Sequence, residues 1–336
     1  MKRFKSILLI CDEGSVDDAV MARTIGLAKA NGARVTVVDV LDVAPGELTR
    51  LFSSLPGVRA HDAEYEVLQF YQSRLERVAA RFEDESIEVS EAVLLGIPFM
   101  EIIRKVLRDG HDLVMKQAGG AREGRSMFFA STDLHLLRKC PCPVWIMKTS
   151  GRPHYASILA AVDPVPEDEQ RSALATLTMD LATSLARMDD SELHIVNAWQ
   201  LDEENTLRDS AFLKFPSDKV DALVEARRQE NERNLEALLS DYPTDGLNAH
   251  SHLLKGEPRD VIPDFADQQR IELIVMGTVG RTGIRGLFIG NTAEAILSQV
   301  QCSVLAVKPP GFETPVHVDL EAGEATNNRA RNTRRA

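Results

Sequence analysis

The sequence lacks an apolar run of the ~20 residues that a membrane-spanning helix requires. Near the N-terminus, the apolar stretch of residues 7–11 is followed at once by Asp12 and Glu13. A secretory signal needs a longer apolar core and a small-residue cleavage site, so this start predicts a first β-strand instead. We therefore expect a cytoplasmic protein without a membrane span.

Cysteine is scarce, and basic residues are outnumbered by acidic ones. The net charge of −12 argues against general nucleic-acid binding, because a phosphate backbone is neutralised by clustered Lys and Arg. The four cysteines form no Cys-x2-Cys pair and have no histidine at metal-ligand spacing: Cys11, Cys140, Cys142 and Cys302. This pattern predicts neither a disulfide framework nor a zinc site. Cys140 and Cys142, which flank Pro141, are typical of buried, inert thiols.

The two halves of the chain repeat one pattern. Glycine and proline recur 160 residues apart, as Gly96 with Gly256 and Pro98 with Pro258. The same spacing continues without a gap as far as Lys148 and Lys308. Nearer the start of each half the spacing is 151, which matches Asp12 with Asp163. Such constant register indicates two copies of one domain in tandem.

Strands and helices alternate in both copies. The apolar segments that predict strands are 6–11, 34–40, 87–95, 112–116 and 143–148, then 157–162, 192–199, 249–255, 272–276 and 303–307. Several are apolar without alternation, which is typical of parallel strands buried on both faces. The fold class is therefore α/β: two tandem doubly wound domains, each a five-stranded parallel sheet with helices on both faces. We expect two separate sheets.

The domain boundaries follow from this repeat. The first domain spans residues 1–150 and the second 155–310, with a linker so short that the two should pack against each other. Residues 311–336 are predicted to form a flexible charged tail that ends in an Arg-rich segment.

A glycine-rich loop follows a buried strand of the second half. The strand ends near Met276, Gly277 and Gly280 follow, and Gly290 precedes a helix. In open α/β sheets, ligands lie beyond the carboxyl ends of the strands. Glycine lets a phosphate approach the backbone and permits positive φ, so we interpret this loop as a phosphate cradle. A turn shaped only for packing is the alternative.

The helix after this loop offers an anion site. Asn291 is predicted to be its N-cap, and Glu294, three residues on, would complete a capping box. Free N–H groups and the positive end of the helix dipole favour a bound anion there.

The spacing of these three glycines resembles the Gly-x2-Gly-x9-Gly pattern of the universal stress protein family, which continues with Ser or Thr. Here Asn291 takes the place of the hydroxyl residue, and Thr292 follows. Residues 4–310 are similar throughout to the tandem, two-domain E-type members.

This resemblance implies a stress-response protein that binds ATP or a related adenine nucleotide in its second domain. Asp163 would hold the ribose or adenine end and Ala198 would face the base, while Gly277, Gly280, Gly290, Asn291 and Thr292 would hold the phosphates. Whether Mg accompanies the nucleotide, and whether the chain forms a homodimer, stays open.

The first half departs from the pattern. Gln117 stands in place of Gly277, Ala130 in place of Gly290 and Ser131 in place of Asn291, with only Gly120 retained. We expect no nucleotide to bind there in the same way.

Two other functions stay open. An enzyme that uses the bound nucleotide would need a general base or a metal-holding carboxylate near the γ-phosphate, and the loop offers only Arg281, Thr282 and Arg285. We expect no catalytic and no metal-ligating residues, and at most weak hydrolysis. Alternatively, because Asn291 departs from the pattern, the cleft would hold another small or amphipathic ligand.

Overall fold

The computed structural model describes residues 3–11, 15–119, 129–148, 152–209, 216–243, 246–278 and 290–318. The strands of the first half are β1 (Ser6–Ile10), β2 (Arg34–Leu41), β3 (Val89–Leu95), β4 (Leu113–Gln117) and β5 (Val144–Met147). Those of the second half are β6 (Ser157–Ala161), β7 (Glu192–Trp199), β8 (Ala249–Lys255), β9 (Leu273–Gly277) and β10 (Ser303–Val307). All five strands predicted in each half are present.

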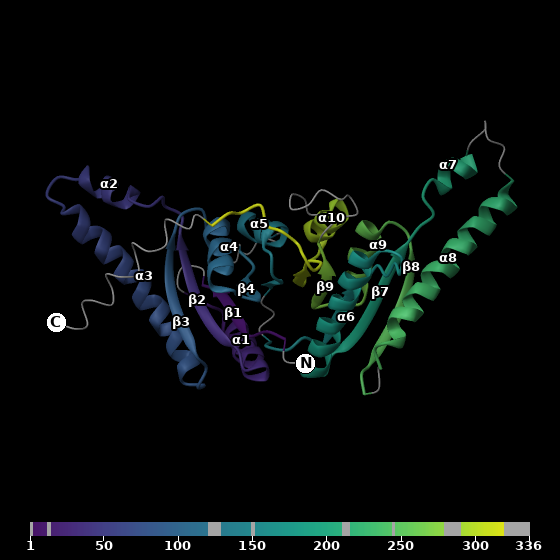
Figure 1. Ribbon diagram of the computed structural model, residues 1–336, viewed down its shortest axis with the longest axis horizontal. Helices are drawn as coiled ribbons and strands as arrows, with labels where there is room; N and C mark the ends of the chain where they lie inside the picture. The colour runs from purple at the N-terminus through teal and green to yellow at the C-terminus, as the bar shows by residue number, and fades with distance from the viewer. Residues whose placement is uncertain are drawn as a thin grey trace.

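The two halves share one continuous sheet, with strand order β3-β2-β1-β4-β5-β10-β9-β6-β7-β8 (Figure 1). Within each half all pairings are parallel, as predicted. The prediction of two separate sheets is wrong, because β5 and β10 pair antiparallel, with Val304 opposite Ile146. Each is the last strand of its half and would otherwise leave an unpaired edge. Gly120, Gly280 and Asp12, which we expected to superpose on their counterparts, lie outside the described residues.

Helices cover both faces of the sheet. They are α1 (Asp18–Asn31), α2 (Glu47–Ser53), α3 (Ala60–Glu83), α4 (Pro98–Asp109), α5 (Ser131–Lys139), α6 (Glu169–Asp189), α7 (Glu204–Asp209), α8 (Ser217–Ser240), α9 (Pro258–Gln268) and α10 (Asn291–Gln299). The pairs α2–α3 and α7–α8 project from opposite ends of the molecule (Figure 1). The short helices α2 and α7 were not predicted.

Two cores lie on the two faces of the sheet. Successive residues of β1 alternate between them, Ile7 and Leu9 in one and Leu8 and Ile10 in the other. One core contains residues of α1, α3, α6 and α8, and the other contains residues of α4, α5, α9 and α10. Both cores run through both halves, so the two domains pack together as expected.

A buried ion pair joins α1 of the first half to α6 of the second. Arg23 donates two hydrogen bonds to the carboxylate of Asp189, one of them 2.8 Å long, and the side chains are only 3% and 0% exposed. The Arg23 guanidinium also lies 4.6 Å from the ring centroid of Tyr155. Such planar, bidentate contacts suit a buried interface.

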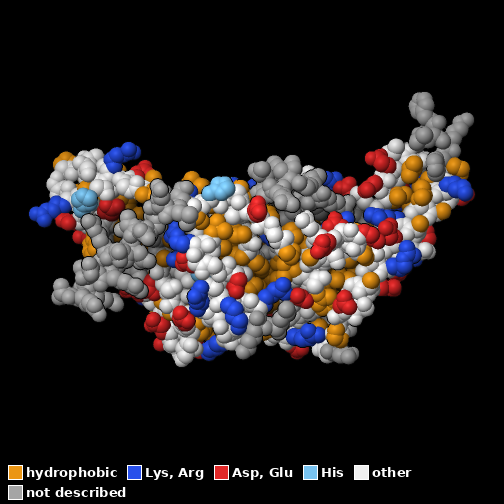
Figure 2. All heavy atoms as spheres, viewed as in Figure 1, with side chains coloured by type: hydrophobic (Ala, Val, Ile, Leu, Met, Phe, Trp, Pro, Cys, Tyr) orange, Lys and Arg blue, Asp and Glu red, His pale blue; other side chains and the backbone are white. Residues whose placement is uncertain are grey.

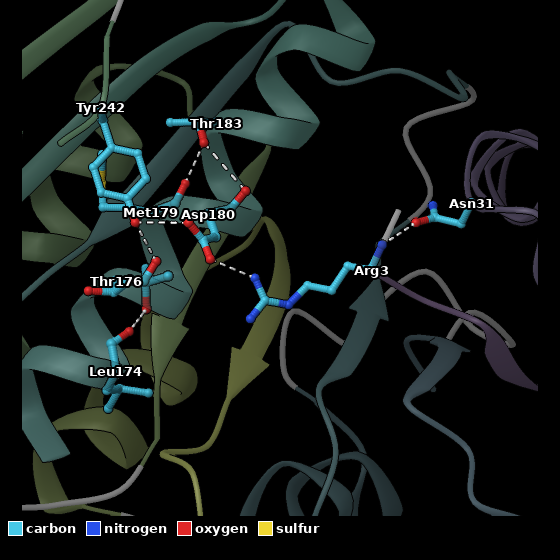
Figure 3. Close-up of polar contacts among 9 residues, drawn as sticks. Arg3, Asn31, Leu174, Thr176, Met179, Asp180, Thr183 and Tyr242 are labelled. Carbon is cyan, nitrogen blue, oxygen red and sulfur yellow. Dashed lines mark hydrogen bonds and ion pairs between the residues drawn. The ribbon is translucent and has the colours of Figure 1, made fainter. Parts of the chain in front are cut away.

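A second bridge between the halves is more exposed. Arg3, just before β1, reaches across to Asp180 of α6, with 2.9 Å between nitrogen and oxygen (Figure 3). The hydroxyl of Tyr242 lies 2.9 Å from the same carboxylate and 2.9 Å from the main-chain oxygen of Thr176, so its single proton is shared between these two acceptors. Burial and the Asp180 carboxylate raise the pKa of Tyr242.

The predicted tail begins later than residue 311. Val316 is buried in the core that contains α4, and the carbonyl oxygen of His317 accepts a hydrogen bond of 3.3 Å from Arg104 of α4. These contacts place the residues up to 318 against the first half. The remaining tail, 319–336, lies outside the described residues.

The surface carries charges of both signs. Figure 2 shows Lys and Arg side chains interspersed with Asp and Glu on one face, with apolar side chains gathered near its centre. No helix in the described ranges is both long enough and apolar enough to cross a membrane.

Candidate functional site

Three neighbouring strands of the second half bring the first predicted residues together at one edge of the sheet. Strand β6 pairs in parallel with both β9 and β7, so their carboxyl ends lie side by side. Gly277 ends β9, Ala198 is next to last in β7, and Asp163 lies two residues beyond β6. This is the edge where ligands bind in open α/β sheets.

The start of α10 lies at the same edge. Gly290 N donates a hydrogen bond of 3.0 Å to the carbonyl of Thr278, the residue after β9. Asn291 and Thr292 form the first, exposed turn of α10. The predicted residue Gly280 lies outside the described residues, as do the loop residues Arg281, Thr282 and Arg285.

The predicted capping box is wrong. Gly290 is the N-cap of α10, and its carbonyl accepts the N–H of Glu294 at 3.0 Å. Asn291 is therefore the first helical residue, and no described side chain caps this end of the helix. The carboxylate of Glu294 instead pairs with Arg138 of α5, across the junction between the halves.

Gly290 also lacks the backbone conformation that would require glycine. Its φ is −62° and its ψ is 139°, which any residue adopts. The positive φ that glycine permits is therefore not used at Gly290. What glycine provides at this position is the absence of a side chain beside the helix start.

The equivalent place in the first half holds an internal carboxylate. Asp133, in the first turn of α5, accepts hydrogen bonds of 3.0 Å from the N–H groups of Gly119 and Ala130. Its other oxygen lies 3.1 Å from the ammonium of Lys116, with the side chains 0% and 4% exposed. These N–H groups, at the end of a strand and the start of a helix, are the kind that would bind an anion. The first half thus fills this anion position with its own carboxylate, Asp133.

The second half lacks both charged partners. At the spacing of 160 residues, Met276 takes the place of Lys116 and Ala293 the place of Asp133. The start of α10 therefore has no internal carboxylate at the position that Asp133 fills in α5. Sequence reasoning missed this difference, although a lysine inside a buried strand and an acid three residues after Ala130 were visible signals.

Gly277 has a clear packing role. A Cβ at this residue would lie 2.9 Å from Cγ of Leu174, a residue of α6. The φ of Gly277 is not positive. The absence of a side chain at Gly277 therefore lets α6 pack against the end of β9, whatever the loop beyond it binds.

The Asp163 carboxylate is half exposed and forms an ion pair with Arg171 of α6. Nearby, the side-chain amide of Asn197 donates a hydrogen bond of 3.0 Å to the carbonyl of Val162. This contact ties the ends of β6 and β7 together beside Ala198. It holds the Asp163 and Ala198 segments in a fixed relation.

A buried lysine lies behind this edge of the sheet. Lys308, which follows β10, donates hydrogen bonds to the carbonyl of Leu137 and to the hydroxyl of Thr278. The Thr278 hydroxyl also donates to Leu137, at 3.2 Å. Burial lowers the pKa of Lys308 to about 7. The strand end that carries Gly277 is therefore attached to α5 of the first half.

A groove of about 470 Å³ lies along α6, away from these residues. It is lined by Arg3, Pro166, Glu169, Ser172, Ala173, Thr176, Leu177, Asp180 and Pro310. The contact between Arg3 and Asp180 at its side is drawn in Figure 3. None of the predicted nucleotide-binding residues lines it. Across the ranges that the structure describes, no three or more His, Cys, Asp or Glu side chains are grouped to hold a metal ion.

Comparison with known proteins identifies the family. The family model described as "Universal stress protein family" matches residues 3–148 and again 154–308. The chain belongs to the universal stress protein family. It is 30% identical over 330 residues to Universal stress protein E of Escherichia coli (strain K12), an alignment that covers 96% of this chain and 99% of the relative. The Haemophilus influenzae homologue of that protein is 27% identical, covering 91% and 98%.

Solved structures share this fold over nearly the whole chain. A functionally unknown protein of Pseudomonas aeruginosa PAO1 superposes with a TM-score of 0.68 at 23% identity, covering 92% of this chain and 94% of that one. A universal stress protein of Archaeoglobus fulgidus DSM 4304 superposes with a TM-score of 0.59 at 18% identity, covering 92% and 98%. These likenesses support the fold.

Proposed function

We propose that this chain is a non-catalytic stress-response protein that binds ATP or a related adenine nucleotide in its second half. The phosphates would lie at the start of α10. One observation carries the proposal: Asp133 fills the anion position in the first half, and Ala293 leaves the same position without a carboxylate in the second.

The electrostatic argument rests on the two helix starts. The first turn of a helix presents N–H groups and a partial positive charge, and an anion there contributes about 0.3–2 kcal/mol. In α5 that anion is Asp133, which accepts the Gly119 and Ala130 N–H groups. In α10 no described side chain caps the helix, and Glu294 is turned toward Arg138. A phosphate group would supply the missing negative charge.

The remaining predicted residues fit the other end of a nucleotide. The half-exposed Asp163 carboxylate can accept hydrogen bonds from ribose hydroxyls, and Ala198 offers a small apolar surface for a base. Asn291 and Thr292 are exposed in the first turn of α10, where their side chains can donate to phosphate oxygens. Gly280 would form part of the loop over the phosphates.

The test rebuilds the first-half arrangement in the second half. Met276→Lys combined with Ala293→Asp would place a lysine–carboxylate pair at the start of α10. We expect the affinity for ATP, measured by isothermal titration, to fall at least about tenfold, since the carboxylate would repel the phosphates at short range. The wild type should bind one nucleotide per chain.

Ser298→Asp is the matched control, because it adds one negative charge to an exposed position at the other end of α10. It should bind ATP as the wild type does. Two equal sites per chain, or unchanged affinity in a folded double variant, would contradict the proposal. Phosphate release tests the enzymatic alternative, and native mass spectrometry of the purified protein tests for a different small or amphipathic ligand.

A further inference from the structure

Cys140 and Cys142 face each other at the junction between the two halves. Their sulfur atoms lie 3.6 Å apart, close enough for one thiol to donate a hydrogen bond to the other. Cys140 is fully buried at the end of α5, and Cys142 is partly exposed. Cys142 is therefore the more exposed residue of the two.

A buried lysine accompanies this pair. Lys308 is only 6% exposed, and its hydrogen-bond partners, the Leu137 carbonyl and the Thr278 hydroxyl, are neutral. Within the described ranges no carboxylate forms an ion pair with it. A buried ammonium is stabilised by a nearby anion, and the thiol pair is the group beside it that can become one.

The ionisation of the two thiols is linked. Burial opposes ionisation of Cys140, but the hydrogen bond from Cys142 and the charge of Lys308 bring the pKa of Cys140 below its usual value. The same hydrogen bond, together with burial, raises the pKa of Cys142. The pair therefore releases one proton readily and shares the other between its two sulfurs.

We propose that Cys140 and Cys142 form a thiol oxidation site that a hydroperoxide converts into an intramolecular disulfide. This inference is independent of nucleotide binding. Three observations support it: the short sulfur–sulfur distance, the partial exposure of Cys142, and the buried Lys308, whose charge interacts with both thiols.

The chemistry balances with hydrogen peroxide as the oxidant. Once the proton shared by the two sulfurs moves onto Cys140, the Cys142 thiolate attacks one peroxide oxygen; the O–O bond breaks, and a sulfenic acid and hydroxide form. Cys140 then attacks the Cys142 sulfur, an S–S bond forms, the S–O bond breaks, and water leaves. The hydroxide takes up the proton that the pair released at first. Two thiols and one peroxide thus give one disulfide and two waters, and the sulfurs must approach to about 2.05 Å.

The second half contains a natural control. At the spacing of 160 residues, Cys302 is the counterpart of Cys142, but Val300 replaces Cys140. Cys302 is also partly exposed, and burial raises its pKa to about 12. Like Cys142, it lies just before the last strand of its half, but it has no partner thiol.

The experiment treats the reduced, full-length chain with hydrogen peroxide, alkylates the remaining thiols and identifies them by mass spectrometry after tryptic digestion. Cleavage after Lys139 and Lys148 releases both cysteines in one peptide. Disulfide formation lowers the mass of that peptide by two hydrogens. It should occur at peroxide concentrations at least about tenfold lower than those needed to modify Cys302, because thiol reactivity follows thiolate content. Lys308→Met should slow disulfide formation at least about threefold for the same reason.

Two variants keep the inference falsifiable. Cys140→Val introduces the residue that the second half has at the equivalent position, Val300, so the fold should accommodate it. Without its partner thiol, Cys142 should react as slowly as Cys302. Cys302→Val should leave disulfide formation unchanged. The inference is overturned if Cys142 accumulates as sulfenic or sulfinic acid without a disulfide in the wild type. Oxidation of Cys302 and the pair at equal rates, or an unchanged rate in folded Lys308→Met, would overturn it as well.

Discussion

Lys148, the residue after β5, donates a hydrogen bond of 2.9 Å from its ammonium to the main-chain oxygen of Val300, at the end of α10 in the other half. Its counterpart Lys308 does the same to Leu137, near the end of α5. Each half thus places the amine of a lysine against the negative end of a helix in its partner half. The antiparallel pairing of β5 with β10 makes this exchange symmetrical.

The buried position of Lys308 predicts a specific pH dependence of stability. Its folded pKa of about 7 lies below the unfolded value of about 10.4, so the unfolded chain binds more protons between these two values. The free energy of unfolding should therefore rise with pH across this window. Lys308→Met should remove that slope, whatever it does to stability at a single pH.

Denaturant unfolding at several pH values between 6 and 10 measures the difference. Both chains should carry Cys140→Val, Cys142→Ser and Cys302→Val, because the pKa values of these thiols also differ between the folded and unfolded chains. If the unfolding free energies of the chains with and without Lys308→Met change with pH in parallel, Lys308 stays charged in the folded protein.

Removing one partner of the Lys116–Asp133 ion pair should lower the free energy of unfolding strongly. Replacing both partners should lower it much less. Asp133→Ala leaves a buried ammonium without its carboxylate, and we expect a loss of about 3–5 kcal/mol in unfolding free energy. The double variant Lys116→Met, Asp133→Ala copies the second half and should recover most of that loss. A urea-unfolding cycle of the two single variants and the double variant checks this; additive effects would mean that the pair is not coupled.

Gly290→Val tests the phosphate site at its centre. The backbone at residue 290 accepts any side chain, so the variant should fold as well as the parent. Its branched side chain would occupy space beside the start of α10, and the affinity for ATP should fall at least about tenfold. Arg281→Ala should weaken binding less, because an exposed arginine–phosphate contact is screened by solvent.

Isothermal titration of both variants, with circular dichroism as the folding check, gives the answer. Parental affinity in a folded Gly290→Val chain would mean that this glycine does not face a phosphate.

Gly277→Ala should act on stability. The added methyl would meet Leu174 of α6, and overpacking of this kind costs about 1–3 kcal/mol. Pairing it with Leu174→Ala should restore part of the loss, because the smaller side chain makes room. Thermal unfolding of the single and double variants measures the effect; a stable Gly277→Ala chain would rule out the packing role.

Regular structure was largely predictable from the order of apolar residues. The strands at residues 192–199, 249–255 and 303–307 were predicted with the bounds that the structure shows. Buried parallel strands are marked by continuous apolar runs, and such runs depend on local sequence alone. The short helices α2 and α7 were missed because helices of only seven and six residues show little apolar periodicity.

The candidate site was only partly predictable. The spacing of Gly277 and Gly290 correctly located one loop at the carboxyl ends of the strands, but the capping box was wrong. Glu294 has the right spacing for a cap, yet Arg138, far away in sequence, takes its carboxylate. A charged partner supplied by another domain leaves no trace in local spacing.

The sequence by itself determined that the chain is a tandem repeat of one parallel α/β unit, because that conclusion needs only internal register and the order of apolar segments. Tertiary structure alone decided how the two units combine. The edge strands β5 and β10 paired and made one sheet, in which Lys308 contacts Leu137 of the other half. It also decided that Asp133 fills the anion position in one half. These outcomes depend on contacts between residues distant in sequence, and such contacts exist only once the chain has folded.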